Sequence, residues 1–216
     1  MTSDHEKGLA AAAAADMVKH GMRVGLGTGS TVAFLLRALA ARDAKVTYVA
    51  TSPRTEDAVR ALGLDVEAFE NVDELDLAID GADQISREGW LIKGGGGAHT
   101  REKIVASAAG YFVVIADSTK LVETLHAPVP PELVNFGLAA TMRYLQPVSL
   151  RDGHPSSDGG RLADYHGDAS KPAILSDRLD VTAGIVAHGL FAPTLVSRLL
   201  VGVGDIVRSS SPGAVI

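Results

Sequence analysis

Residues able to do acid–base chemistry concentrate in one stretch of 24 residues. It opens with two aspartates, Asp80 and Asp83, and closes with Lys93, four consecutive glycines at 94–97, and Glu102. Carboxylates and an ammonium group beside mobile backbone N–H donors can move protons and stabilise an oxyanion. These residue types in this spacing predict proton transfer on a sugar-like substrate.

The two aspartates follow an apolar run at 75–79 that predicts a buried strand. For a single Asp-Gly pair, a turn capped by the Asp side chain would be a sufficient explanation. Here Asp83 lies within reach of Asp80 across a Gly-Ala spacer, and two carboxyls so close separate in pKa. Either of them could be the one that holds a proton.

The four glycines and the helix after them have both a functional and a structural explanation. The glycines permit positive φ and close approach of backbone donors to a ligand, or they form a flexible hairpin. Glu102 lies in the first turn of the predicted helix at 101–109, where the helix dipole alone would favour an acidic residue. His99 and Arg101 are expected to be exposed.

A second glycine-rich loop, at 25–31, is expected to bind an anion. It connects a predicted strand at 22–26 to a helix. The free backbone N–H groups at the start of that helix would therefore favour a bound anion. The hydroxyls of Thr28, Ser30 and Thr31 add donors; in the structural alternative, Ser30 or Thr31 caps the helix. Ser30 replaces the third glycine of a dinucleotide fingerprint, and no lysine precedes it as in a Walker A loop. The ligand expected at this loop is therefore a monophosphate or a similar small anion.

Strands and helices alternate along the first half of the chain. Ser3 and Glu6 form a capping-box pattern that opens the first helix. This alternation predicts a Rossmann-like parallel sheet flanked by helices, with ligands at the carboxyl ends of its strands. The predicted helices are 3–18, 31–41, 52–62 and 101–109, and the predicted strands are 22–26, 45–50, 75–79 and 111–116.

Three prolines within residues 128–131 end this alternation and predict a domain boundary. Beyond it, a helix at 136–145, a strand at 146–151 and a turn at 156–160 indicate a small inserted α+β domain, expected to be ferredoxin-like. The run at 199–207 is expected to return to the first sheet. The expected division is a catalytic α/β domain of residues 1–125 plus 200–216, and a small domain of residues 126–199 with oligomer contacts.

The amino-acid composition limits the classes of partner that the protein is expected to bind. A net charge of −6 and 5% aromatic residues leave neither a basic surplus nor stacking platforms for nucleic acid. The absence of cysteine excludes disulfides and thiolate catalysis. No apolar run approaches the ~20 residues that span a bilayer, and the N-terminus lacks the basic start of a signal peptide. A cytoplasmic protein without membrane contacts is expected.

Four blocks of the sequence together resemble the ribose-5-phosphate isomerase family, type A. The likeness runs in order from about Lys7 to the C-terminus, and the combination of motifs is highly specific. A weaker similarity to the family lies at 189–191. The blocks are Gly25 to Thr31, Asp80 to Asp83, Lys93 to Ala98 with Arg101-Glu102-Lys103, and Ala116 to Lys120.

The resemblance implies interconversion of D-ribose 5-phosphate and D-ribulose 5-phosphate through a cis-enediolate, a step of the non-oxidative pentose phosphate pathway, without metal or organic cofactor. It implies that Glu102 moves the proton between C1 and C2. Asp80 and Asp83 would assist ring opening and proton transfer at the hydroxyls, and Lys93 would stabilise the oxyanion. Family members are commonly homodimers or tetramers. The implied substrate-binding residues are Lys7, Thr28, Gly29, Ser30, Thr31, Gly81, Ala82, Gly94, Gly95, Gly96 and Lys120.

The chain departs from the family pattern in four places. His99 stands where an apolar residue, usually Leu, is expected, and Thr119 replaces a common Ser. The segment 129–133 is a looser version of a Pro-Val-Glu-Val segment, and the turn at 157–160 replaces a Thr-Asp-Asn-Gly-type turn. These differences bear on substrate preference and oligomer contacts more than on reaction type.

Two other functions fit part of the sequence. A related sugar-phosphate enzyme, such as an amino-sugar-phosphate deaminase or a phosphogluconolactonase, would not require Asp80, Asp83, Lys93 and Glu102 in this spacing. A sugar-phosphate-sensing domain of a transcriptional regulator should carry a basic helix-turn-helix, for which the chain has neither room nor charge. The isomerase is therefore the preferred interpretation.

Overall fold

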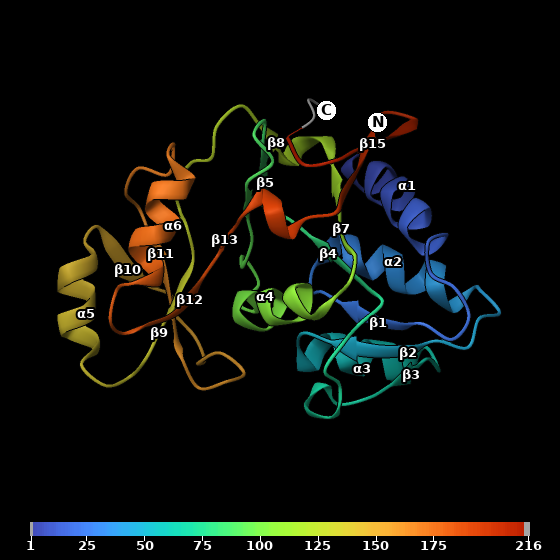
Figure 1. The fold of residues 1–216 in the computed structure, drawn as a ribbon, viewed down its shortest axis with the longest axis horizontal. Helices are drawn as coiled ribbons and strands as arrows, with labels where there is room; N and C mark the ends of the chain where they lie inside the picture. The colour runs from blue at the N-terminus through green and yellow to red at the C-terminus, as the bar shows by residue number, and fades with distance from the viewer. Residues whose placement is uncertain (1, 214–216) are drawn as a thin grey trace.

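A computed structural model describes residues 2–213, which form a large parallel sheet, two smaller sheets and the helices that cover them (Figure 1). The largest sheet has seven strands in the order β15-β14-β7-β4-β1-β2-β3. All neighbours in it are parallel except the β14–β15 hairpin. The strands are β1 (Arg23–Leu26), β2 (Thr47–Ala50), β3 (Asp65–Val66), β4 (Leu77–Gly81), β7 (Phe112–Asp117), β14 (Arg198–Val203) and β15 (Ile206–Ser210).

This sheet confirms the predicted Rossmann-like class. Its interior strand β7 is buried along its whole length, as expected for an apolar, β-branched strand with helices on both faces. The predicted return of the 199–207 run is also confirmed, because β14 pairs with β7 in parallel.

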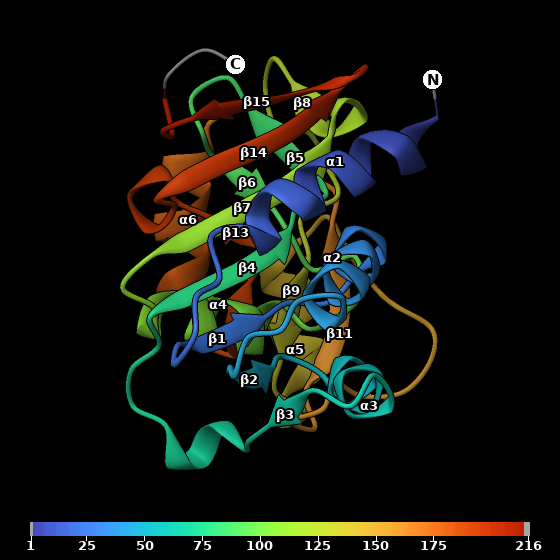
Figure 2. The same ribbon diagram turned by 90° about the vertical axis from the view of Figure 1, so that its right-hand side faces the viewer.

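Helices cover both faces of the sheet (Figure 2). On one face, α1 (Ser3–Ala15) and α2 (Ser30–Ala40) pack against each other and against β7 and β4. On the same face, α3 (Pro53–Ala61) packs on β2 and β3 and shares an apolar core with α1 and α2. On the other face, α4 (His99–Ala108) lies between the large sheet and the rest of the chain. None of the helices within residues 2–213 combines the length and hydrophobicity that crossing a bilayer needs.

The predicted capping box at the start of α1 is wrong. Thr2 is the N-cap, without a side-chain cap bond. The Glu6 carboxylate instead accepts hydrogen bonds from the Ser118 N–H and hydroxyl and from the Gly204 N–H, at 2.6–2.9 Å. The Ser118 hydroxyl and then these backbone N–H groups lower the pKa of Glu6 to about 2. The Glu6 carboxylate therefore binds donors from distant segments of the chain and not the N-terminus of its own helix, which the local spacing predicts.

The second sheet has the order β10-β11-β9-β12 and is antiparallel. Its elements follow the chain as β-α-β-β-α-β, which is the ferredoxin-like arrangement expected from the sequence. The elements are β9 (Pro131–Leu133), α5 (Leu138–Leu145), β10 (Val148–Leu150), β11 (Arg161–Tyr165), α6 (Pro172–Asp180) and β12 (Ile185–His188).

A third, small sheet lies between the two larger ones and shares apolar core residues with each (Figure 1). Its order is β13-β6-β5-β8, and it was not predicted because its strands have only two or three residues. It matters because β6 leads directly into Lys93. The strands are β5 (Gln84–Ser86), β6 (Leu91–Ile92), β8 (Leu121–Val122) and β13 (Leu190–Phe191).

Candidate active site

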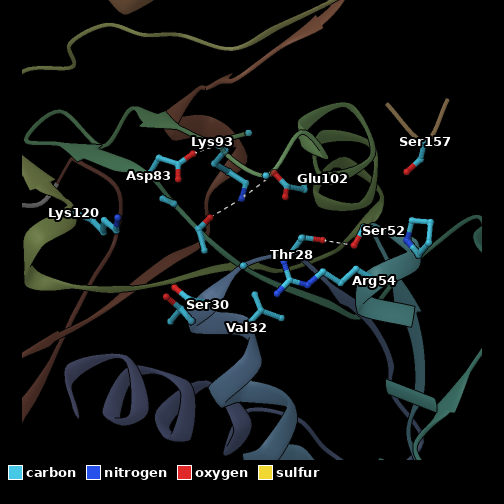
Figure 3. Close-up of a pocket in the computed structure, with 18 residues that line it drawn as sticks. Thr28, Ser30, Val32, Ser52, Arg54, Asp83, Lys93, Glu102, Lys120 and Ser157 are labelled. Atoms are coloured by element: carbon cyan, nitrogen blue, oxygen red, sulfur yellow. Dashed lines mark hydrogen bonds and ion pairs between the residues drawn. The ribbon is translucent and has the colours of Figure 1, made fainter. Parts of the chain in front are cut away.

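A cleft of about 350 Å³ opens at the carboxyl ends of β1, β2 and β4 (Figure 3). Thirteen of the fifteen residues that the sequence assigned to the site line this cleft, so segments far apart in the chain do meet at one sheet edge. The two exceptions are Asp80, which lies just behind the wall, and Lys7. The lining comprises Thr28, Gly29, Ser30, Thr31, Val32, Ser52, Pro53, Arg54, Gly81, Ala82, Asp83, Lys93, Gly94, Gly95, Gly96, Glu102, Lys120 and Ser157.

Lys93 is the centre of the polar network. Its side chain is 3% exposed, and its Nζ lies 2.7 Å from Asp80 Oδ2 and 3.2 Å from Glu102 Oε2. The same Nζ donates a hydrogen bond of 2.6 Å to the carbonyl oxygen of Gly81. One hydrogen bond and two ion pairs therefore hold the buried ammonium group in place.

Burial and charge act against each other in this network. Burial, then the negative charge of Asp80, raises the pKa of Glu102 to about 8, although Lys93 opposes the shift. Burial likewise raises the pKa of Asp80 against the pull of Lys93. For Lys93, burial alone would lower the pKa, but the two carboxylates hold it above its usual value. The result is a permanent ammonium beside a carboxyl group that titrates near neutral pH.

Asp80 is part of a strand and not of the loop after it. β4 runs two residues beyond its predicted end, so the Asp80 side chain is buried under the glycine loop. A Cβ at position 27 would lie 1.7 Å from Asp80 Oδ1, so Gly27 is required for this close approach. Asp80 supports Lys93 from behind the cleft wall.

Asp83 is exposed and has a different partner. Its Oδ2 accepts a hydrogen bond of 2.8 Å from the N–H of Gly95, which fixes the glycine loop at 94–97. The two carboxyls that meet at one ammonium are therefore Asp80 and Glu102, not the sequence neighbours Asp80 and Asp83. The strand geometry explains this, because the Gly-Ala spacer carries the chain out of the sheet between the two aspartates.

The loop at 25–31 presents helix N-terminal N–H groups to the cleft. α2 begins at Ser30 with Gly29 as its N-cap, at φ 148°, and no side chain caps it. The alternative in which Ser30 or Thr31 is the capping residue is therefore wrong. The Thr28 hydroxyl is turned to Ser52 Oγ (2.7 Å) and Thr55 Oγ1 (3.0 Å), so it joins two loops instead of facing the cleft centre.

Glu102 is held by a helix whose first turn is anchored on the second sheet. α4 begins two residues earlier than predicted, and the Thr100 hydroxyl donates to Glu132, a β9 carboxylate that is 1% exposed. Arg101 makes a bidentate ion pair with Asp158, with N–O distances of 2.7–3.0 Å. These contacts leave Glu102, the next residue, directed into the cleft.

His99 was expected to be exposed, and this prediction is wrong: the side chain is 0% exposed. It packs under the glycine loop at 94–97, where a Cβ at Gly94 would lie 2.7 Å from His99 Nδ1. Neither ring nitrogen has a hydrogen-bond partner of normal geometry within residues 2–213, and the Ala187 backbone favours the protonated ring only weakly. Burial, followed by the charge of Lys103, lowers the pKa of His99 to about 3.

Lys7 lies on α1, with its Nζ 3.4 Å from Asp4 Oδ1 and its side chain 14% exposed. Three polar residues that the sequence interpretation missed line the cleft: Ser52, Arg54 and Ser157. The first two follow β2, whose carboxyl end borders β1, so strand order would have identified them. Ser157 comes from the second sheet and had no local signal. Within residues 2–213, no group of three or more His, Asp or Glu side chains is arranged to hold a metal ion.

Comparison with known proteins is consistent with this geometry. The sequence profile described as ribose 5-phosphate isomerase A (phosphoriboisomerase A) matches residues 47–205. The chain is 41% identical to a ribose-5-phosphate isomerase A of Gluconobacter oxydans, over 95% of this chain and 96% of that one. For a relative from Bartonella quintana the identity is 43%, over 92% and 93%.

Solved structures agree with the sequence relatives. The crystal structure of ribose 5 phosphate isomerase A from Neisseria gonorrhoeae superposes with a TM-score of 0.92 at 33% identity, covering 98% of each chain. A second structure, of D-ribose-5-phosphate isomerase in complex with phospho-erythronic acid, has a TM-score of 0.91 at 29% identity, covering 98% of this chain and all of that one. The chain belongs to the ribose 5-phosphate isomerase A family.

Proposed function

We propose that this protein is an aldose–ketose isomerase that interconverts D-ribose 5-phosphate and D-ribulose 5-phosphate without a metal or organic cofactor. Family membership supports this reaction, and one structural observation carries it. A buried carboxyl group with a pKa of about 8, Glu102, faces the cleft beside the fixed ammonium of Lys93. This is the base and the positive charge that proton abstraction next to a carbonyl requires.

The reaction follows from these positions. Glu102 takes the proton from C2 of the open-chain aldose; the C–H electrons form the C1–C2 double bond, and O1 becomes an oxyanion. Lys93 and the N–H groups of 94–96 stabilise that charge in the cis-enediolate. The proton returns from Glu102 to C1, and the O2 hydroxyl proton is transferred to the O1 oxyanion, which leaves a hydroxyl at C1 and the ketone at C2. Asp83, at the cleft edge, serves ring opening and hydroxyl proton transfer, while Asp80 keeps Lys93 charged and raises the pKa of Glu102.

The substrate phosphate is assigned to the start of α2. The N–H groups after Gly29, the Ser30 hydroxyl and the Lys120 ammonium line one end of the cleft. Lys7 stays a predicted phosphate ligand from α1. Anchoring the phosphate there orients C1 and C2 toward Glu102, which is where remote binding contributes to rate.

One assay tests the reaction itself. Protein treated with a chelator is incubated with ribose 5-phosphate, and ribulose 5-phosphate formation is followed. The proposal predicts turnover that chelation does not abolish, and competitive inhibition by phospho-erythronic acid, the ligand named for the related structure. Binding of ribose 5-phosphate without turnover would instead support a sugar-phosphate-sensing module.

We also propose that residues 126–199 form a distinct small domain through which the chain self-associates as a dimer or tetramer. The proposal rests on large apolar side chains exposed on this part of the chain, which a second copy would cover. Phe136 is 94% exposed and Tyr144 is 72% exposed. Sedimentation of the wild type and of the F136S/Y144S double variant tests it; an unchanged sedimentation coefficient contradicts it.

A further inference from the structure

The most informative residue that neither the sequence nor the reaction explains is Arg54. It is the second residue of α3, after the N-cap Ser52 and Pro53 at the first helical position. Its side chain is exposed and lines the cleft. Figure 3 shows it extending from α3 toward the loop that contains Thr28 and Ser30.

A hydroxyl network fixes the backbone that carries Arg54. Thr28 Oγ1 lies 2.7 Å from Ser52 Oγ and 3.0 Å from Thr55 Oγ1, and the Thr55 hydroxyl donates to the carbonyl of Gly27 at 3.1 Å. Ser52 in turn accepts the N–H of Thr55 at 3.2 Å. The glycine-rich loop at 25–31 and the start of α3 are thus joined by hydrogen bonds into one unit. The Thr28 hydroxyl that the sequence assigned to the phosphate instead holds Arg54 next to it.

The charges of the cleft leave a role for this guanidinium. Lys93, Lys120 and Arg54 are the three cationic side chains among its lining residues. Lys93 is paired with two carboxylates, so its charge is already compensated. Within residues 2–213, neither Lys120 nor Arg54 has a carboxylate oxygen within 4 Å of its charged nitrogens. A sugar phosphate carries close to two negative charges at neutral pH, and apart from Arg54 the described residues of the cleft lining offer it one unpaired cation, Lys120.

We propose that Arg54 binds the substrate phosphate from the side opposite Lys120 and thereby selects phosphorylated over free pentoses. The inference rests on the proposed function only for the identity of the sugar. A guanidinium presents two parallel N–H donors to phosphate oxygens, a geometry that lysine lacks. Arg54 lies on the side of the cleft formed by the loop at 25–31, away from Glu102. It therefore contributes to phosphate binding and not to proton transfer.

The test compares R54A and R54K with R60A. Arg60 is on the same helix but is paired with Glu56 at 2.6 Å and does not line the cleft, so R60A is the matched control. For R54A we expect KM for ribose 5-phosphate to rise roughly 10- to 100-fold, the range for losing hydrogen bonds to a charged group, with kcat within threefold. R54K should fall between R54A and the wild type, and R60A should match the wild type. Activity on unphosphorylated D-ribose should be the same in all four proteins.

A second measurement keeps the test independent of catalysis. Binding of inorganic phosphate, followed by phosphorus NMR, should weaken in R54A and stay normal in R60A even if the wild type proves not to be an isomerase. An unchanged KM together with unchanged phosphate binding in R54A would overturn the inference, as would a loss confined to kcat. Circular dichroism confirms that each variant is folded.

Discussion

At the scale of single residues, the site depends on how burial and charge divide protons between two carboxyl groups. Asp80 and Glu102 both touch the Nζ of Lys93, and both are 4% exposed or less. One ammonium cannot fully compensate two buried carboxylates, so the more weakly paired Glu102 has its pKa raised to about 8. A base that titrates near the working pH is effective in both directions of a reversible proton transfer.

The first prediction concerns the pH dependence of this base. If Glu102 is the base as proposed, it acts as a carboxylate, so kcat/KM should rise with pH to a plateau as the group ionises near pH 8. D80N removes a negative charge that raises this pKa, so the rising limb should move to lower pH. Asp83 contributes less to the same pKa, so D83N should move the limb less. Profiles of kcat/KM between pH 5 and 10 measure this, and a limb that D80N leaves in place would contradict it.

Sequence motifs together with the family resemblance identified thirteen of the residues that line the cleft. They did not predict partners. The pairing of Asp80 with Lys93 depends on where β4 ends and on the missing Cβ of Gly27, and both are tertiary facts. The burial of His99 was missed because its own side chain is polar, although the apolar residue usual at this position in the family was a sign that the position is covered.

At the scale of elements, α4 connects Glu102 to the second sheet. Thr100 and Arg101 are held by Glu132 and by Asp158, and Glu132 also accepts a hydrogen bond from the Ser156 hydroxyl. The turn that contains Ser156 thereby brings Ser157 to the cleft wall. A buried β9 carboxylate fixes both α4, which carries Glu102, and this turn.

The second prediction follows from this anchoring. E132A removes the acceptor of both hydroxyls, so the start of α4 loses a fixed position and kcat should fall roughly 10- to 100-fold, the cost of a small misplacement of a base. D158N weakens only a part-exposed ion pair, and its kcat should stay within about threefold of the wild type. Steady-state kinetics on both variants decide this. Equal kcat values for E132A and the wild type would show that Glu132 does not position Glu102.

The third prediction concerns His99, whose imidazole is buried without good partners. H99L should raise the free energy of unfolding by about 1–3 kcal/mol at pH 7.5, the cost of an unsatisfied buried polar group. The gain should be larger at pH 5, because the folded-state pKa of about 3 lies below that of an unfolded histidine. The wild type loses stability as pH falls below about 6.5, when the unfolded chain binds a proton that the folded chain excludes.

Urea unfolding at the two pH values measures this effect. H154L, at an exposed position, is the control and should change stability little at either pH. A destabilised H99L would show that the imidazole makes a favourable contact under the glycine loop.

At the scale of the whole molecule, the cleft exists because three sheets meet at one edge. The order of helices and strands predicted the large sheet, the return of β14 and the ferredoxin-like second sheet, since periodicity and breaker residues report on elements of ordinary length. It did not predict the third sheet, whose short strands are formed by pairing between distant segments such as β6 and β13. That pairing places Lys93, because the Lys93 N–H donates to the carbonyl of Gly189 at 2.8 Å.

Glu102 is the proposed base, and E102Q removes its ability to accept a proton while keeping its size. The ionised carboxylate is unfavourable where it is buried, since its raised pKa means that stability declines as pH rises from about 4.5 to about 8. E102Q should therefore be folded and no less stable than the wild type at pH 8. The measurement is the rate of ribose 5-phosphate conversion in D2O after chelation, with deuterium followed at C1 and C2. We predict that E102Q loses at least about 10²-fold in kcat and loses deuterium incorporation in parallel, while still binding phospho-erythronic acid. A folded E102Q that retains the wild-type rate would contradict this role for Glu102.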